Sequence, residues 1–145
     1  MYKNILIATD GSELSHKAIR HGIDLAKVLG ARVTAFTATT PWHSLAVGEV
    51  AVMLDPDDYA KRAAANAASY LAAVKAEADK LGIACDTVHR EDEHPYQAII
   101  DTAKQKGCDL IVMASHGRRG LSGLVLGSET VKLLTHSAIP VLVYR

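Results

Sequence analysis

Short, strongly apolar segments alternate along this chain with longer segments of helical periodicity. Five segments are predicted to be strands, at residues 2–8, 31–39, 83–89, 110–114 and 141–144. Four helices are predicted to begin near residues 13, 57, 95 and 128. Continuous apolar runs such as Ile5-Leu6-Ile7 are typical of strands that are buried on both faces. The alternation therefore predicts right-handed βαβ units and an α/β fold with a parallel sheet between helices.

Two parts of this order are less regular. The strand at 83–89 is weakly apolar and is predicted at a sheet edge, followed by a solvated turn at Arg90-Glu91-Asp92-Glu93. The connection from residue 40 to residue 58 is long for a compact domain, and such connections are commonly lids or binding loops.

Composition limits the class of protein. A chain of 145 residues with 49% hydrophobic content is the size of one ordinary domain, so we expect a single domain over residues 1–145. Its 16 basic and 16 acidic side chains cancel, and no basic block is present, which argues against nucleic acid as a partner. No apolar run approaches the ~20 residues of a membrane span. Cys85 and Cys108 are isolated, as is usual in a reducing compartment, so a soluble cytoplasmic protein is expected.

Residues 109–130 combine a strand, a glycine-rich loop and a helix start. Gly117, Gly120 and Gly123 follow the strand, and Gly127-Ser128 opens the helix. Glycine lets backbone N–H groups approach a ligand closely, and a helix N-terminus favours an anion such as phosphate. Neither G-x-x-x-x-G-K-S/T nor a strand followed by G-x-G-x-x-G occurs. A phosphate cradle of another kind is therefore predicted, with the Ser128 hydroxyl as an added donor.

The spacing resembles the nucleotide-binding signature of the universal stress protein family, G-x2-G-x9-G followed by Ser or Thr. Here it becomes Ala114-x2-Gly117-x9-Gly127-Ser128, with alanine in place of the first glycine. The resemblance extends over the whole chain, through residues 5–12, Asp109-Leu110-Ile111-Val112-Met113, Ser115-His116-Gly117 and residues 139–143. It implies a three-layer α/β/α domain with strand order 3-2-1-4-5. Strands one and four then flank the point where strand order reverses, which is where such sheets bind ligands.

The resemblance to the ATP-binding branch of the family implies a two-ended site. The adenosine end would be formed by Ala8, Asp10 and the backbone of Ala38. The phosphate end would use backbone and side chains of Ala114, Ser115, His116, Gly117, Arg118, Arg119, Gly120, Gly127, Ser128, Glu129 and Thr130. The implied ligand is ATP, or ADP or AMP, with or without Mg²⁺.

Several of these residues have a second interpretation. Asp10 can serve only as a turn former, because Asp-Gly is a common turn pair, and Gly117 and Gly127 can serve only loop geometry. Arg118 and Arg119 can pair with phosphate oxygens or remain solvated, while for His116 we favour a side chain facing solvent. The methyl group of Ala114 either blocks close approach or is harmless, the latter if φ is negative and Cβ points into the sheet. We expect it to be harmless.

No catalytic constellation is recognisable. The sequence shows no nucleophile with a local base, no paired carboxylates and no magnesium-anchoring motif, and His89 and His94 match no metal-ligand spacing. Any hydrolysis is therefore expected to be slow, and the resemblance implies a nucleotide-binding stress-response regulatory protein that acts as a sensor or switch. The resemblance implies a homodimer through the apolar C-terminal strand, residues 141–145, at a sheet edge. The alternatives are a dimeric interaction module that binds no nucleotide, and a nucleotide hydrolase.

Overall fold

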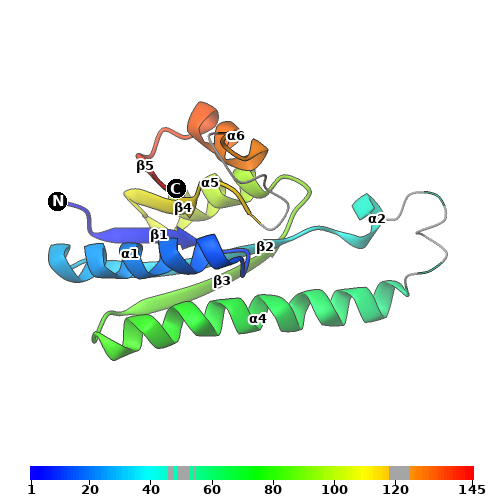
Figure 1. The fold of residues 1–145 in the computed structure, drawn as a ribbon, viewed down its shortest axis with the longest axis horizontal. Helices are drawn as coiled ribbons and strands as arrows, with labels where there is room; N and C mark the ends of the chain where they lie inside the picture. The colour runs from blue at the N-terminus through cyan, green and yellow to red at the C-terminus, as the bar shows by residue number, and fades with distance from the viewer. Residues whose placement is uncertain (46–47, 49–52, 54, 118–124) are drawn as a thin grey trace.

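A parallel five-stranded sheet forms the centre of the molecule (Figure 1). The computed structural model describes residues 1–45, 48, 53, 55–117 and 125–145. The strands are β1 (Asn4–Ala8), β2 (Arg32–Thr39), β3 (Cys85–Glu91), β4 (Leu110–Ala114) and β5 (Val141–Tyr144). Their order is β3-β2-β1-β4-β5 and every pairing is parallel, so the predicted fold class and strand order are confirmed.

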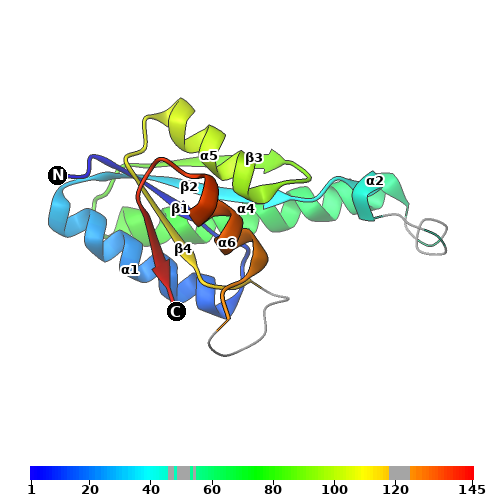
Figure 2. The ribbon, with the colours of Figure 1, turned by 90° about the horizontal axis from the view of Figure 1, so that it is seen from above.

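Helices cover both faces of the sheet (Figure 2). Helices α1 (Glu13–Leu29) and α4 (Pro56–Lys80) pack on one face, and α5 (Pro95–Lys106) and α6 (Ser128–His136) pack on the other. These are the four predicted helices. A short helix, α2 (Trp42–Leu45), lies in the long connection after β2; residues 46–47, 49–52 and 54 of that connection lie outside the described residues.

The continuous apolar run of β1 is explained by two separate cores. Ile5 and Ile7 are fully buried among the side chains of α1 and α4, while Leu6 is fully buried among those of α5 and α6. Because successive strand residues point to opposite faces, a strand between two helical layers needs apolar side chains at every position. Helix α1 packs very closely here, since a Cβ at Gly22 would lie 2.8 Å from Cδ1 of Ile7.

Local backbone and capping chemistry sets the ends of α1 and α5. The Ser12 hydroxyl accepts the Ser15 N–H at 3.2 Å at the start of α1, and Gly30 ends this helix at φ 63°. Pro95 opens α5 and Gly107, at φ 66°, ends it. The predicted ends of both helices are confirmed.

Strand β3 begins and ends two residues later than its sequence suggests. It lies at the sheet edge, as predicted, but it continues through Arg90 and Glu91, which pair with Ala38 and Thr39 of β2. The predicted turn at these two residues is wrong, because pairing to β2 outweighs the turn preference of the charged run. Strand β2 is extended to Thr39 by the same pairing, which carries its end to the functional region described below.

The described residues include no helix that is both long enough and apolar enough to cross a membrane. Cys85 is half-buried and Cys108 is buried, and both are free cysteines. Burial raises the pKa of both thiols. They therefore remain protonated at neutral pH and behave as small apolar groups.

Candidate functional site

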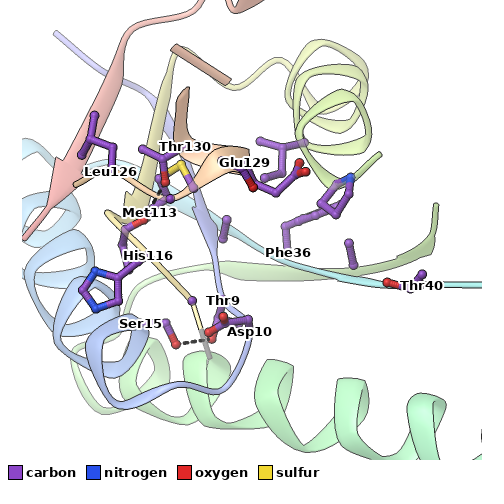
Figure 3. Close-up of a pocket in the computed structure, with 18 of the residues that line it drawn as sticks. Thr9, Asp10, Ser15, Phe36, Thr40, Met113, His116, Leu126, Glu129 and Thr130 are labelled. Carbon is purple, nitrogen blue, oxygen red and sulfur yellow. Dashed lines mark hydrogen bonds between the residues drawn. The ribbon is translucent and has the colours of Figure 1, made fainter. Parts of the chain in front are cut away.

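A cavity of about 680 Å³ opens at the carboxyl ends of β1, β2 and β4 (Figure 3). Strand β1 is followed in sequence by β2 on one side of it, whereas its neighbour on the other side is β4. The cavity therefore lies where the strand order reverses, the usual ligand position in open α/β sheets. Figure 3 shows His116 and Thr40 at opposite ends of the lining residues.

The structure brings most of the predicted site residues together. Ten of them line the cavity: Ala8, Asp10, Ala38, Ala114, His116, Gly117, Gly127, Ser128, Glu129 and Thr130. Ser115 is only 4% exposed and lies beneath the lining. Arg118, Arg119 and Gly120 lie outside the described residues. Nine further lining residues were not predicted: Thr9, Ser15, Phe36, Thr40, Pro95, Ile99, Met113, Val125 and Leu126.

Asp10 lies in a tightly held turn after β1. One of its carboxylate oxygens, Oδ1, accepts the Ser12 N–H at 2.9 Å. The preceding residue, Thr9, donates its N–H to the Phe36 carbonyl at 2.9 Å, and the Thr37 hydroxyl donates to the Thr9 carbonyl at 2.7 Å. Asp10 thus forms the turn and also lines the cavity, so the two interpretations of this residue are compatible.

The turn at Asp10 and Gly11 packs so closely that two positions, Gly11 and Gly117, have no room for a Cβ atom. Gly11 has φ +76°, and a Cβ there would clash with the ring of Tyr70 from α4. A Cβ at Gly117 would clash with the Asp10 carboxylate. The Asp10–Gly11 turn is therefore enclosed between α4 and the end of β4, and neither glycine can gain a side chain without moving it.

The start of α6 faces the cavity through its backbone. Gly127 donates its N–H to the Ser115 carbonyl at 2.7 Å, and the buried Thr130 hydroxyl donates to the same carbonyl at 3.0 Å. Within the described residues, no side chain caps the helix at Gly127. The first N–H groups of a helix have no intrahelical acceptor, and together they attract an anion. We call Gly117, Gly127 and Ser128, with the first turn of α6, the helix end of the cavity.

The carboxylate of Glu129 has a structural partner. Its Oε2 accepts the Tyr96 N–H at 3.0 Å, in the first turn of α5, where His94 provides no side-chain cap. Glu129 thus ties the start of α6 to the start of α5. Glu129 also lines the cavity, so the place at the phosphate end that the resemblance implies for it stays a prediction.

Another part of the cavity lining is apolar. Phe36 and Ile99 belong to the core beneath α5 and α6, and Ala8, Ala38 and Met113 pack against that core. We call these five residues the apolar end. Such a surface favours a flat, weakly polar group such as a purine base.

Charge and metal-binding capacity are limited. Among the described lining residues, the charged side chains are those of Asp10 and Glu129. No group of three or more His, Cys, Asp or Glu side chains in the described part of the chain could hold a metal ion. Within the described residues, an anion at the helix end would therefore depend on backbone N–H groups and on Ser128.

Ala114 fits its position without backbone strain. No described residue other than glycine has a positive φ, and Ala114 pairs with Tyr144 as the last residue of β4. It is 7% exposed. The alanine therefore satisfies the φ condition on which we expect it to be harmless.

Comparisons with known proteins agree on one family. The sequence matches the Universal stress protein family over residues 1–145. A universal stress protein of Methanocaldococcus jannaschii is 33% identical over 148 residues, covering 100% of this chain and 83% of the relative. The solved universal stress protein UspA from Lactobacillus plantarum has a TM-score of 0.83 at 25% identity, covering 99% of this chain and 98% of that one.

Two similar folds have been solved with a nucleotide. A universal stress protein in complex with cAMP has a TM-score of 0.71 at 23% identity, covering 99% of this chain and 97% of that one. The universal stress protein from Archaeoglobus fulgidus in complex with dAMP has a TM-score of 0.69 at 18% identity, covering 99% and 98%. At these identities the likeness establishes the shared fold.

Proposed function

Because this chain belongs to the universal stress protein family, we propose that it is a stress-response regulatory protein that binds an adenine nucleotide in the cavity at the ends of β1 and β4. The observation that carries the proposal is the pairing of an apolar end with a helix start that no described side chain caps, in one cavity of about 680 Å³. The base occupies the apolar end and the phosphate lies against the helix end. The related folds solved with cAMP and with dAMP support adenine nucleotide binding.

The ligand is proposed as ATP, ADP or AMP, with Mg²⁺ as an accompanying ion for the longer phosphates. Asp10 and Glu129 place negative charge in the lining, so a triphosphate needs a counter-charge more than a monophosphate does. We therefore expect ATP to bind more tightly with Mg²⁺ than without it, and AMP to be little affected by the ion.

Equilibrium titration tests the proposal. Protein freed of ligand by unfolding and refolding is titrated with adenosine, AMP and ATP, the last with and without Mg²⁺, while heat is recorded. Trp42 lies two residues after the cavity residue Thr40 and supplies a fluorescence signal. Saturable binding with one nucleotide per chain supports the proposal. Absence of any binding at millimolar nucleotide contradicts it and favours the alternative, an interaction module.

Catalysis is proposed to be slow or absent. The described lining residues offer Asp10 and His116, but no nucleophile with an oriented base. A turnover faster than about one per second would contradict a switch and favour the hydrolase alternative. Phosphate release by the purified protein measures this rate.

The homodimer is proposed to form through β5. This strand lies at a sheet edge, and its Leu142 side chain is 38% exposed. Sedimentation should show a dimer that Leu142→Asp converts to a monomer, because a buried carboxylate without a partner is costly. Val28→Asp, which changes an exposed residue of α1, is the matched control. A dimer that survives Leu142→Asp would exclude this interface.

A further inference from the structure

Helix α4 has two unlike halves. Its buried residues are Ala67, Leu71, Val74 and Ala78, all in the second half, and none of residues 56–66 is buried. Figure 1 shows the first half reaching beyond the strands toward α2. Since burial supplies most of the stability of a helix within a protein, specific contacts must fix the position of the first half.

Two tyrosines of α4 contact the rim of the cavity. The Tyr59 hydroxyl donates to the Thr40 carbonyl at 2.6 Å, directly after β2. The Tyr70 ring lies against Gly11, directly after β1 and next to Asp10. Thr40 and Asp10 both line the cavity. One helix therefore touches the ends of both strands that carry Ala8 and Ala38.

The spacing of the tyrosines makes this double contact possible. They are eleven residues apart, and three helical turns take about 10.8 residues, so both project from the same face of α4. The rise between them is about 16 Å. One rigid helix thus reaches the ends of both β1 and β2 beside the cavity.

We propose that Tyr59 and Tyr70 are positioning residues that set the spacing of the β1 and β2 ends at the cavity, and that nucleotide binding in turn orders residues 56–66. The inference rests on the proposed nucleotide site. A ligand held between Ala8 and Ala38 restrains Asp10 and Thr40, and these restrain the two tyrosines. By thermodynamic linkage, any partner that shifts the first half of α4 must change nucleotide affinity by the same factor that the nucleotide changes partner affinity.

Tyr59→Phe tests the inference, because it removes a single hydroxyl and keeps the ring. The lost bond should weaken adenosine and AMP binding equally, by about 3- to 10-fold. The ratio of the two dissociation constants, which reports the phosphate contribution, should not change. A purely structural loss would lower thermal stability and leave affinity well below the unfolding temperature as it was. Tyr2→Phe makes the same change at the opposite end of β1 and should leave both affinities unchanged.

Hydrogen exchange tests the same inference without ligand. In the unliganded protein, Tyr59→Phe should speed exchange in residues 38–44 and 56–62 by about 5-fold, and Tyr2→Phe should not. Exchange identical to that of the wild type in both segments would overturn the positioning role. If the wild type binds no nucleotide, the proposed function fails, and this exchange result alone decides whether the tyrosines position the strand ends.

AMP addition to the wild type completes the test. It should slow exchange in residues 56–66, and Tyr59→Phe should reduce that slowing. Binding of AMP with no change in residues 56–66 would overturn the coupling while leaving the nucleotide site in place.

Discussion

The two ends of the cavity are built from different parts of the chain. The helix end is formed by backbone groups of Gly117, Gly127 and the first turn of α6. The apolar end is formed by side chains that belong to the core beneath α5 and α6 or pack against it. Backbone donors can contact any phosphate, whereas apolar side chains define a shape. The difference suggests that the helix end supplies affinity for phosphate and the apolar end selects the base.

The largest expected effect on AMP affinity comes from a substitution at the helix end. Gly117→Val places a branched side chain where the Asp10 carboxylate lies. Overpacking of this kind costs about 1–3 kcal/mol, so AMP binding should weaken by about 10- to 100-fold. Calorimetric titration measures the change.

Gly107→Asn provides the control for that variant. Gly107 has φ +66°, a left-handed conformation that asparagine tolerates, and a Cβ there meets no atom within 4 Å. Its affinity for AMP should equal that of the wild type. If Gly117→Val also binds AMP normally, the close contact between Gly117 and Asp10 has no role in the site.

At the apolar end, Ala38→Leu should reduce the space for the base. Adenosine and AMP binding should both weaken by about 10-fold, since added methylenes in an apolar pocket discriminate at this level. Ala73→Leu, on the exposed side of α4, is the matched control. Weakening of AMP binding alone would show that Ala38 acts on the phosphate, and would reverse the assignment of the two ends.

A smaller effect, on the free energy of unfolding, is expected from removing the hydrogen bonds that attach α6 to the end of β4. Thr130→Val removes the hydroxyl that donates to the Ser115 and Ala114 carbonyls at 3.0 and 3.3 Å. The free energy of unfolding should fall by about 1–2 kcal/mol. Thr135→Val, which loses a bond to the Val131 carbonyl in the same helix but is exposed, should cost less than about 0.5 kcal/mol. If denaturant titrations show that both substitutions lower the free energy of unfolding by the same amount, the hydrogen bonds of Thr130 have no special role.

The smallest expected effect concerns the pH dependence of the contacts between Glu93 and helix α2, which lie close in sequence to the cavity residues Thr40 and Pro95. The Ser44 hydroxyl donates to Glu93 at 2.6 Å and His43 lies 2.9 Å from it, and these contacts hold the pKa of the Glu93 carboxyl below its usual value of 4.5. A depressed pKa stabilises the folded state above the unfolded pKa, and this contribution disappears as the pH falls through the folded pKa. Exchange in residues 42–45 should therefore rise only below about pH 4.5. In Glu93→Gln that pH dependence should be absent, and its persistence would exclude Glu93 as the cause.

The helix end could be predicted from sequence because its geometry requires particular residues. Gly117 and Gly127 lie where a Cβ would meet Asp10 or the Ser115 carbonyl, so the backbone arrangement leaves a visible glycine pattern. Ser12, Gly30 and Gly107 likewise marked helix ends through their own conformations.

The apolar end could not be predicted in the same way. Phe36, Ile99 and Met113 resemble any other buried strand or helix residue, and only the folded arrangement brings them to one cavity. The capping role of Glu129 and the contacts of Tyr59 and Tyr70 depend on elements distant in sequence. The end of strand β3 was predicted two residues too early for the same reason, since its last pairs are set by β2.

The most direct measurement is a crystal structure of this protein with AMP. We expect the adenine ring to lie against Ala8, Ala38 and Met113, and the phosphate within hydrogen-bonding distance of the first N–H groups of α6. A nucleotide in the reverse orientation, or one bound outside this cavity, would contradict the two-ended site.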